Sequence, residues 1–163
     1  MARGTLSAQD GVIAVNGAVL QMFNHGLSAA GMFFLVGVIY DRTHTRDLNA
    51  FGGLWAKMPV YGAILIFTSM ASLGLPGLNG FVSEFLVVRG SWPIFTAYTA
   101  LAMIGLLFTG AYVLKGVGKV LHGPLNTALV AEVAHHGGSL EINFREVVTI
   151  APLLVLILSI ILI

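Results

Sequence analysis

A single carboxylate, Glu84, lies in an almost wholly apolar stretch of the chain, "LGLPGLNGFVSEFLVV" at residues 73–88. No other charged residue lies between Lys57 and Arg89. A carboxylate in apolar surroundings can take up and release a proton, and an ionisable residue inside a long apolar segment usually has a function. Glu84 is therefore the first candidate for proton-transfer chemistry. The alternative is a helix that ends near Gly77, with Glu84 paired to Arg89 as an ordinary surface ion pair.

The residues just before Glu84 favour irregular backbone. They are Gly74, Pro76, Gly77 and Gly80. Proline lacks a backbone N–H and clashes with the preceding helical turn, and glycine lowers the cost of non-helical backbone. We predict that a helix over residues 58–88 is broken between Gly74 and Gly80, with Asn79 and Ser83 as supporting polar groups. Broken helices with polar groups at the break are a recurring device for ion sites in transporters.

His25 is the second candidate, inside a stretch without charged residues from about residue 12 to residue 40. Asn24 and Ser28 beside it complete a polar patch in an otherwise apolar segment. The ordinary pKa of histidine, about 6.5, suits proton transfer. The equally open alternative is a neutral imidazole that hydrogen-bonds to a neighbouring helix.

The other ionisable residues favour no further chemistry. Lys115 and Lys119 stand near the end of an apolar segment, where their ammonium groups can extend to its polar edge. The pair His135-His136 has no acid or thiol partner at metal-ligand spacing, and the chain has no Cys. The sequence therefore predicts no metal site and no iron–sulfur ligation. It also carries no glycine-rich phosphate loop and no nucleophile motif.

The composition indicates a membrane protein. Of the 163 residues, 57% are hydrophobic and only 9% are charged, and the mean hydropathy is +0.92. A soluble domain carries about 25% charged residues, so this chain cannot cover a surface that faces water. The formal net charge of +1 argues against nucleic acid as a partner, because no basic patch or tail is present.

Four apolar segments can position the candidate residues, at about residues 12–40, 58–88, 93–121 and 147–163. A spanning helix needs roughly 20 apolar residues. We predict an all-α fold, a polytopic bundle of about four transmembrane segments with the second one broken, in which residues 1–163 form a single membrane region. Two pairs of small residues at the spacing of helix contacts predict where helices pack: Gly26 with Ala30, and Gly105 with Thr109.

The distribution of Lys and Arg predicts the orientation, because these residues accumulate on the cytoplasmic side. The segments 41–57 and 122–146 must lie on one side, since two spans separate them. That side carries Arg42, Arg46, Lys57, Lys115, Lys119 and Arg145. The other side carries Arg3 and Arg89. The loop-rich side is therefore expected in the cytoplasm, with both termini on the non-cytoplasmic side.

Several stretches resemble a known family. The stretch "NHGLSAAGMFFLVGVIYDRTHTRDLNAFGGLWAKMP", which begins at Asn24, and the later "GLPGLNGFVSEF" are similar to the antiporter-like M chain of proton-pumping NADH-quinone oxidoreductase, respiratory complex I. The resemblance continues through "AYVLKGVGKVLHGP" into the last segment. Taken together, "HGLSAAG", "RTHTRD" and "GLPGLNGFVSEF" are specific for this type of chain.

The resemblance implies roles for the candidate residues. Family members carry inverted repeats, each with one broken helix, and this chain is similar only to their C-terminal part. Glu84 would belong to a broken helix and take part in the proton path, and His25 would lie on the central hydrophilic axis. The family's first broken helix, with its Glu–Lys pair, has no counterpart here. The resemblance therefore implies a C-terminal fragment of an antiporter-like subunit.

The function that the resemblance implies is that of a membrane-arm subunit contributing part of a proton path coupled to quinone reduction. No cofactor is expected on this chain, because FMN, iron–sulfur clusters and quinone would belong to other subunits. The expected partners are other membrane-arm subunits and membrane lipid, and the expected location is the cell inner (plasma) membrane. Two alternatives remain open: a subunit of a multi-subunit sodium/proton antiporter, and a non-conducting structural fragment.

Overall fold

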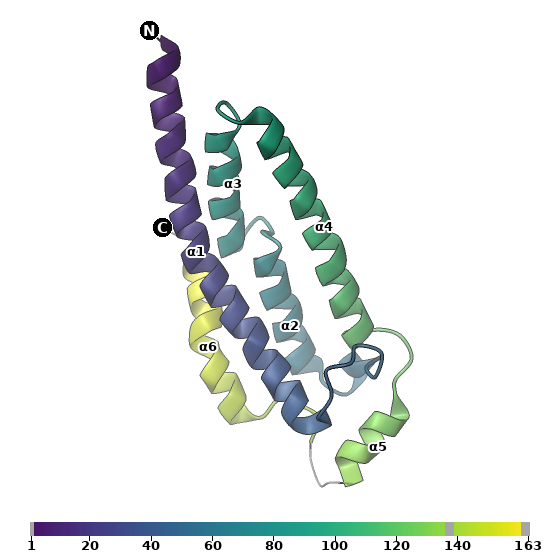
Figure 1. Ribbon diagram of the computed structural model, residues 1–163. Helices are drawn as coiled ribbons and strands as arrows, with labels where there is room; N and C mark the ends of the chain where they lie inside the picture. The colour runs from purple at the N-terminus through teal and green to yellow at the C-terminus, as the bar shows by residue number, and fades with distance from the viewer. Residues whose placement is uncertain (1, 136–138, 161–163) are drawn as a thin grey trace.

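The computed structural model describes residues 2–135 and 139–160, and the regular elements in these residues are all helical (Figure 1). In chain order they are α1 (Ala2–Thr43), a short 3-10 helix η1 (Leu54–Ala56), α2 (Pro59–Ser72), α3 (Asn79–Ser91), α4 (Thr96–Leu121), α5 (Thr127–His135) and α6 (Phe144–Ser159). The all-α prediction is confirmed for this part of the chain.

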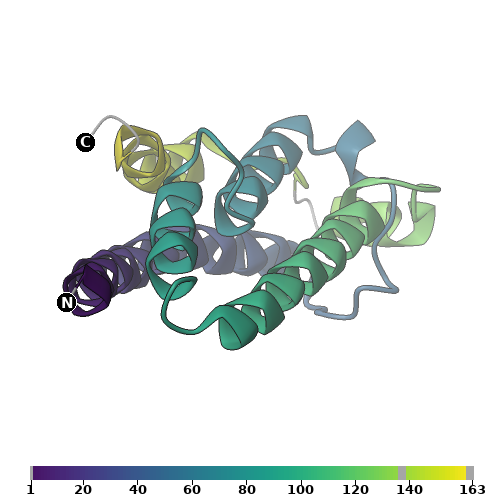
Figure 2. The ribbon, with the colours of Figure 1, turned by 90° about the horizontal axis from the view of Figure 1, so that it is seen from above.

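Helices α2 and α3 lie between α1 and α4, and α6 packs beside α1 (Figures 1 and 2). The most extensive contact between two helices joins α1 to α3. The N-terminal turns of α1 extend beyond the other helices. This helix begins at Ala2 rather than near residue 12. Residues 2–11 are polar enough to end an apolar segment, but they contain no proline that would end a helix.

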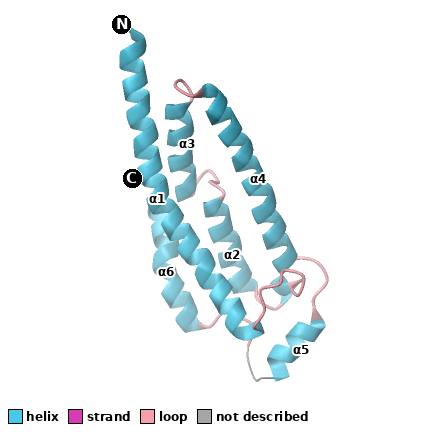
Figure 3. Cartoon of the chain, in the orientation of Figure 1, coloured by secondary structure: helices cyan, strands magenta, loops and turns pink. Residues whose placement is uncertain are grey.

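The apolar stretch at residues 58–88 forms two helices. Helix α2 ends at Ser72, helix α3 begins at Asn79, and residues 73–78 connect them. Gly74 and Gly77 in this loop have φ angles of 66° and 99°, in the region that glycine adopts at no steric cost. Figure 3 shows this loop beside the middle of α1 and α4, whereas the other described loops lie at the two ends of the bundle. Pro76 lies in the same loop.

Gly80 has a different role from the one that the sequence predicts. It belongs to the first turn of α3 and not to the irregular backbone. A Cβ atom at this position would collide with the carbonyl oxygen of Ala71 and would lie 3.3 Å from the Cα of Gly74. Gly80 therefore permits the close approach of α2 and the loop to the start of α3.

One face of α1 runs along the whole bundle with an alternating spacing of four and three residues. Its members are Gly17, Gln21, Asn24, Ser28, Gly31, Leu35, Val38 and Arg42. All of them are buried or half-buried. This heptad spacing keeps one seam of a helix turned toward its partners over many turns. The first half of the seam is small and polar, and the second half is apolar until it ends at the charged Arg42, so the two halves support different kinds of contact.

Glycine residues set how closely α1 and α3 approach. A Cβ atom at Gly17 would lie 2.8 Å from the Cβ of Leu86, and one at Gly90 would collide with the α1 backbone. The predicted packing positions are wrong within this chain, because nothing lies within 4 Å of a Cβ at Gly26 or Gly105. Small residues are common along these helices, so their spacing alone does not show which of them meet a neighbour.

The main apolar core lies at the loop-rich end of the bundle. Its fully buried side chains include Leu35, Leu54, Met58, Tyr61, Leu121 and Ile150. Helix α5 closes this end and contributes Val133 to the core. The sequence analysis treated α5 as part of a polar loop at residues 122–146. The buried pair Leu129 and Val133, four residues apart, is the signal that could have revealed it.

Two of the described helical stretches are long and apolar enough to cross a membrane, Ala8–Thr43 and Thr96–Leu121. Helix α2 is apolar but shorter. The described part of α6 has 16 residues, and residues 161–163 of the predicted fourth segment lie outside the described residues. Most large side chains of α4 are exposed in the isolated chain, among them Tyr98, Leu107 and Phe108.

Candidate functional site

A group of polar side chains lies between α1 and α3, close to the break between α2 and α3. We call it the polar cluster; it consists of Gln21, Asn24, Asn79, Ser83 and Glu84. Helix α1 supplies its first two members from the heptad seam, and the first turns of α3 supply the other three. Asn24, Asn79 and Ser83 are at most 1% exposed. The structure thus brings together four residues that the sequence predicts and one that it does not.

Asn24 and Asn79 hold the two helices together reciprocally. The side-chain amide of Asn24 donates to the backbone carbonyl of Asn79 at 2.8 Å, and the side-chain amide of Asn79 donates to the backbone carbonyl of Asn24 at 3.2 Å. Rotating either amide by 180° would place its oxygen against a carbonyl oxygen, which is repulsive. The hydrogen bonds therefore determine the orientation of both amides.

This arrangement leaves two buried acceptors without a donor. Among the described residues, Oδ1 of Asn24 and Oδ1 of Asn79 have no hydrogen-bond partner. A buried polar atom without a partner costs about 1–3 kcal/mol. Such atoms concentrate where water, an ion or a proton carrier completes the site. The polar cluster therefore has unused hydrogen-bonding capacity in a buried part of the chain.

Ser83 connects the asparagine pair to Gln21. Its Oγ accepts a hydrogen bond from the side-chain amide of Asn24 at 3.0 Å. The Ser83 hydroxyl has three acceptors within reach: the side-chain oxygen of Gln21, the Gly80 backbone carbonyl at 3.0 Å and the Asn79 backbone carbonyl at 3.5 Å. A hydroxyl has one hydrogen, so it can donate to only one of them at a time.

Glu84 lies at the edge of the polar cluster, directly over the helix break. Its carboxylate is so close to Gly74 that a Cβ atom there would collide with Oε2. Its Oε1 accepts a hydrogen bond of 3.3 Å from the side-chain amide of Gln21. The residue is half-buried. The carboxylate thus contacts irregular backbone on one side and a neutral amide on the other.

No cation neutralises Glu84 within the described part of the chain. Among the side chains of residues 8–135 and 139–160, the one ion pair that the structure shows joins Arg42 to Glu146. Arg89, the partner in the alternative interpretation, is exposed. The surface pair between Glu84 and Arg89 is therefore absent from the described structure.

The other predicted residues lie away from Glu84. His25 is on the exposed side of α1, one residue from the heptad seam. Ser28 is buried and donates its hydroxyl hydrogen to the carbonyl of His25 at 3.3 Å. Lys115 and Lys119 are exposed, and Lys119 donates a hydrogen bond to the side chain of Asn49. Their prediction as residues at the edge of a span agrees with this exposure.

Gln21 is not among the residues predicted from the sequence. Its place on the heptad seam, between Gly17 and Asn24, was the available signal, because these positions share one face of a helix. His25 attracted attention as an ionisable residue, whereas an uncharged glutamine in an apolar helix did not. The spacing of the polar residues carries more information here than their ability to titrate.

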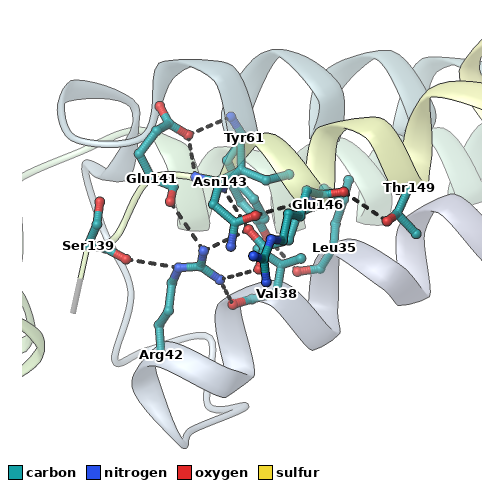
Figure 4. A network of polar contacts seen from close by, with 11 residues as sticks. Leu35, Val38, Arg42, Tyr61, Ser139, Glu141, Asn143, Glu146 and Thr149 are labelled. Carbon is teal, nitrogen blue, oxygen red and sulfur yellow. Dashed lines mark hydrogen bonds and ion pairs between the residues drawn. The ribbon is translucent and has the colours of Figure 1, made fainter.

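A second polar network lies at the opposite, loop-rich end of the bundle (Figure 4). We call it the loop-end clamp; it consists of Arg42, Glu141, Asn143 and Glu146 with the backbone groups they bind. The guanidinium of Arg42 binds the Glu146 carboxylate through two hydrogen bonds of 3.0 and 2.7 Å. Asn143 and Glu146 also form a capping box at the start of α6.

Every N–H group of Arg42 has an acceptor. Beyond the carboxylate of Glu146, the acceptors are the carbonyl oxygens of Val38, Ser139 and Glu141. A guanidinium has five N–H donors, and all five are used here. The hydrogen bonds from Arg42 lower the pKa of the Glu146 carboxyl below its ordinary value of 4.5, and burial opposes this shift only in part.

Glu141 connects the clamp to α2. Its carboxylate accepts hydrogen bonds of 3.0 Å from the backbone N–H groups of Val60 and Tyr61, in the first turn of α2. A carboxylate at a helix N-terminus satisfies free donors and interacts favourably with the helix dipole. The loop-end clamp therefore joins α1, α2 and α6 through a charged network in which the arginine donors are all paired.

The described residues contain no group of three or more His, Cys, Asp or Glu side chains that could hold a metal ion. His136, which the sequence analysis considered with His135, lies outside the described residues. The polar cluster instead offers one carboxylate, two unpaired amide oxygens and a hydroxyl. This set can hold and pass a proton, or accept hydrogen bonds from water.

Comparison with known proteins identifies a family. Residues 4–115 match the family described as NADH:quinone oxidoreductase/Mrp antiporter, TM. Subunit M of NADH-quinone oxidoreductase from Pseudomonas aeruginosa is 45% identical over 112 residues, 69% of this chain and 22% of that protein. NAD(P)H-quinone oxidoreductase chain 4 2 from Synechococcus sp. (strain JA-2-3B'a(2-13)) is 40% identical over 155 residues, 91% of this chain and 28% of that protein.

A solved structure also matches. A chain of respiratory complex I from Thermus thermophilus with bound NADH superposes with a TM-score of 0.77 at 26% identity, covering 97% of this chain and 32% of that chain. The chain thus spans about a fifth to a third of the length of these relatives. The family match covers the polar cluster and most of the helices around it, and the chain belongs to the NADH:quinone oxidoreductase/Mrp antiporter transmembrane family.

Proposed function

We propose that this chain serves as a membrane-arm subunit of a proton-pumping NADH-quinone oxidoreductase and contributes part of its proton path. The observation that carries the proposal is the position of Glu84. Its carboxylate lies over Gly74 at the helix break and is hydrogen-bonded only to a neutral amide in the described residues. A carboxylate without a fixed counter-ion can change its charge without breaking an ion pair, which suits transient proton binding.

The broken segment supports the proposal. Helices α2 and α3 have 14 and 13 residues, so each is about 20 Å long, shorter than a hydrocarbon core of about 30 Å. Together with the loop at residues 73–78 they can form one broken membrane segment among four. The loop then lies at membrane depth, where irregular backbone is tolerated only inside protein or beside a hydrated cavity.

Roles for the other polar residues follow from the same proposal. Asn24, Ser28, Asn79 and Ser83 line the interior beside the path and supply hydrogen bonds. His25 lies on the exposed face of α1. Its place in the proposal is to exchange protons with groups outside this chain and so to connect the path to a neighbouring subunit. The loop-rich end faces the cytoplasm of a cell with both termini on the other side, and FMN, iron–sulfur clusters and quinone belong to other subunits.

The test is Glu84→Gln in the assembled complex. Glutamine keeps the size and most hydrogen bonds but cannot exchange a proton, so assembly and quinone reductase activity should persist while the number of protons pumped per quinone reduced falls severalfold. Vesicles with matched amounts of complex provide the measurement. Glu132→Gln, the same change at an exposed position of α5, is the matched control and should pump normally. Full pumping by Glu84→Gln would exclude the proton-path role.

A second function is favoured by the family itself, whose description includes the Mrp antiporter. In that case the chain contributes to exchange of protons for sodium ions. Proton release from vesicles driven by an added sodium gradient, without NADH or quinone, separates the two functions. A complex that moves protons only during quinone reduction supports the first function. If the Glu84→Gln variant assembles normally and changes neither quinone-coupled proton pumping nor sodium-driven proton release, the chain is a structural component.

A further inference from the structure

We infer that Gln21 is the positioning residue for Glu84 and that rotation of its side-chain amide accommodates both protonation states of the carboxyl group. The inference rests on the proposed proton-path function. It goes beyond that function because it assigns a residue and a movement to the uptake and release of the proton. Among the described residues, Gln21 is the one side chain that hydrogen-bonds to Glu84.

The first state has an ionised Glu84. The Gln21 amide N–H donates to Oε1 of Glu84 at 3.3 Å, while the Gln21 oxygen accepts the hydroxyl hydrogen of Ser83. Oγ of Ser83 accepts from the amide of Asn24 at 3.0 Å. The hydrogen bonds from Asn24 to Ser83, from Ser83 to Gln21 and from Gln21 to Glu84 therefore all donate in the same direction, toward the carboxylate. An amide turned the other way would place its oxygen against the ionised carboxylate, which is repulsive.

The second state has a protonated Glu84. The new carboxyl O–H requires an acceptor, and a rotation of the Gln21 amide by 180° places its oxygen there. The Gln21 N–H then points to Oγ of Ser83, which can accept it. The Ser83 hydroxyl hydrogen turns to the carbonyl of Gly80, already 3.0 Å away. One amide rotation and one hydroxyl rotation thus restore every hydrogen bond, and the backbone does not move.

Neutral partners make this exchange possible. A lysine or arginine in place of Gln21 could donate to an ionised carboxylate but could not accept from a protonated one, since these side chains have no acceptor. A primary amide has both functions at one end of the side chain. The close packing of α1 and α3 around Gly17 holds this amide within reach of Glu84, because that glycine lies one helical turn before Gln21.

The experiment uses the assembled complex with Gln21→Met, which keeps the length of the side chain but removes both donor and acceptor. The rate of proton pumping should fall about fivefold, the change expected for losing one hydrogen bond of ordinary strength. Glu84→Asp, which withdraws the carboxylate from Gln21 by one methylene, should already lose most of this contribution. The double variant should therefore pump no more slowly than Glu84→Asp alone, within a factor of about two.

A spectroscopic measurement separates positioning from a general effect on packing. The infrared C=O band of protonated Glu84, assigned by its loss in Glu84→Gln, should move to higher wavenumber in Gln21→Met because the carboxyl group loses its acceptor. Gln9→Met, the same change at an exposed position of α1, should alter neither the band nor pumping. If Gln21→Met prevents assembly, Gln21→Asn, whose amide is one methylene too short, carries the same expectations.

The outcomes are distinguishable. Loss of pumping in Gln21→Met with a shifted Glu84 band and no further loss in the double variant supports the inference. Pumping at the parent level in Gln21→Met would overturn it, and so would an unmoved Glu84 band. It would also be overturned if Gln21→Met reduced pumping by the same factor in the Glu84→Asp background as in the parent. Pumping lost in Glu84→Gln but unchanged in Gln21→Met overturns the role of Gln21 and leaves the proton path intact. Full pumping in Glu84→Gln removes both.

Discussion

The polar cluster between α1 and α3 and the loop-end clamp both use the heptad seam of α1, yet they are built in opposite ways. In the clamp, all five N–H donors of Arg42 are paired and the Glu146 carboxylate faces a full positive charge. In the polar cluster, Glu84 has only a neutral amide beside it, and two buried amide oxygens have no donor in the described residues.

The difference shows which network can change its charge. Removing the charge of Glu146 would leave Arg42 partly unpaired, so the clamp stabilises one state of the protein. On the inference above, the charge of Glu84 can change while the neighbouring amide and hydroxyl reorient, so the polar cluster offers hydrogen bonds to both protonation states. The fully paired clamp therefore fits a structural role, whereas a carboxylate with only neutral partners fits a site that binds a proton transiently.

The largest effect should come from breaking the clamp. Arg42→Met removes the only cation beside Glu146 in the described residues and leaves three carbonyl groups without this donor. Because the two side chains are 12% and 20% exposed, we expect a loss of about 3 kcal/mol in the free energy of unfolding, the low end for a buried pair. Thermal unfolding of the detergent-solubilised complex measures it.

Two further variants make this prediction sharper. Arg42→Lys should recover only part of the loss, because an ammonium group cannot form the paired contacts of a guanidinium. Arg145→Met, at an exposed position of α6, is the control and should change stability little. If Arg42→Met left stability unchanged but reduced proton pumping, the loop-end clamp would have a role in proton transfer, and the contrast with the polar cluster would be wrong.

A smaller effect should follow from separating α1 and α3. At Gly17 an added methyl group would lie 2.8 Å from the Leu86 Cβ and from the Val87 nitrogen. Overpacking of this kind costs about 1–3 kcal/mol, and the better helix propensity of alanine offsets up to about 1 kcal/mol of it. Gly17→Ala should therefore lower stability modestly and also reduce pumping, because Gln21 and Glu84 move apart.

Gly26 provides the matched control for this change. It lies on the same helix, but nothing is within 4 Å of its added Cβ. Gly26→Ala should leave unfolding unchanged or slightly later, with normal pumping. Equal behaviour of the two alanine variants would contradict the close approach of α1 and α3. The two measurements together show whether the polar cluster depends on the exact separation of the helices more than the clamp does.

The smallest effect concerns pH. Arg42 lowers the pKa of Glu146 below 4.5 in the folded protein. A carboxyl group with a lowered pKa stabilises the fold above its unfolded pKa, and this contribution is lost as the pH falls through the folded pKa. Thermal stability should therefore decrease below about pH 4.5, and Glu146→Gln should make this decrease shallower. An unchanged slope in Glu146→Gln would show that other carboxyl groups dominate acid unfolding.

The amino-acid sequence is sufficient to predict the all-helical class and to single out one candidate residue. The low content of charged residues and the long apolar stretches predicted a helical membrane protein, because unpaired backbone groups are not tolerated in lipid. Glycine and proline around residue 76 predicted irregular backbone, since both disfavour a continuous helix. Glu84 was recognisable because it is the only charge in its stretch. These features depend on local composition and need no knowledge of neighbours.

Which side chains meet depends on how the helices pack, and local sequence patterns do not show it. Gly17 and Gly90 touch a neighbouring helix whereas Gly26 and Gly105 do not, and Gln21 rather than His25 lies beside Glu84. The rotation of each helix about its axis decides these contacts, and it depends on how all the helices pack together. Arg42 likewise meets Glu146 across 104 residues of sequence. No local pattern encodes such a pairing, because the energy that selects it is shared among helices that are distant along the chain.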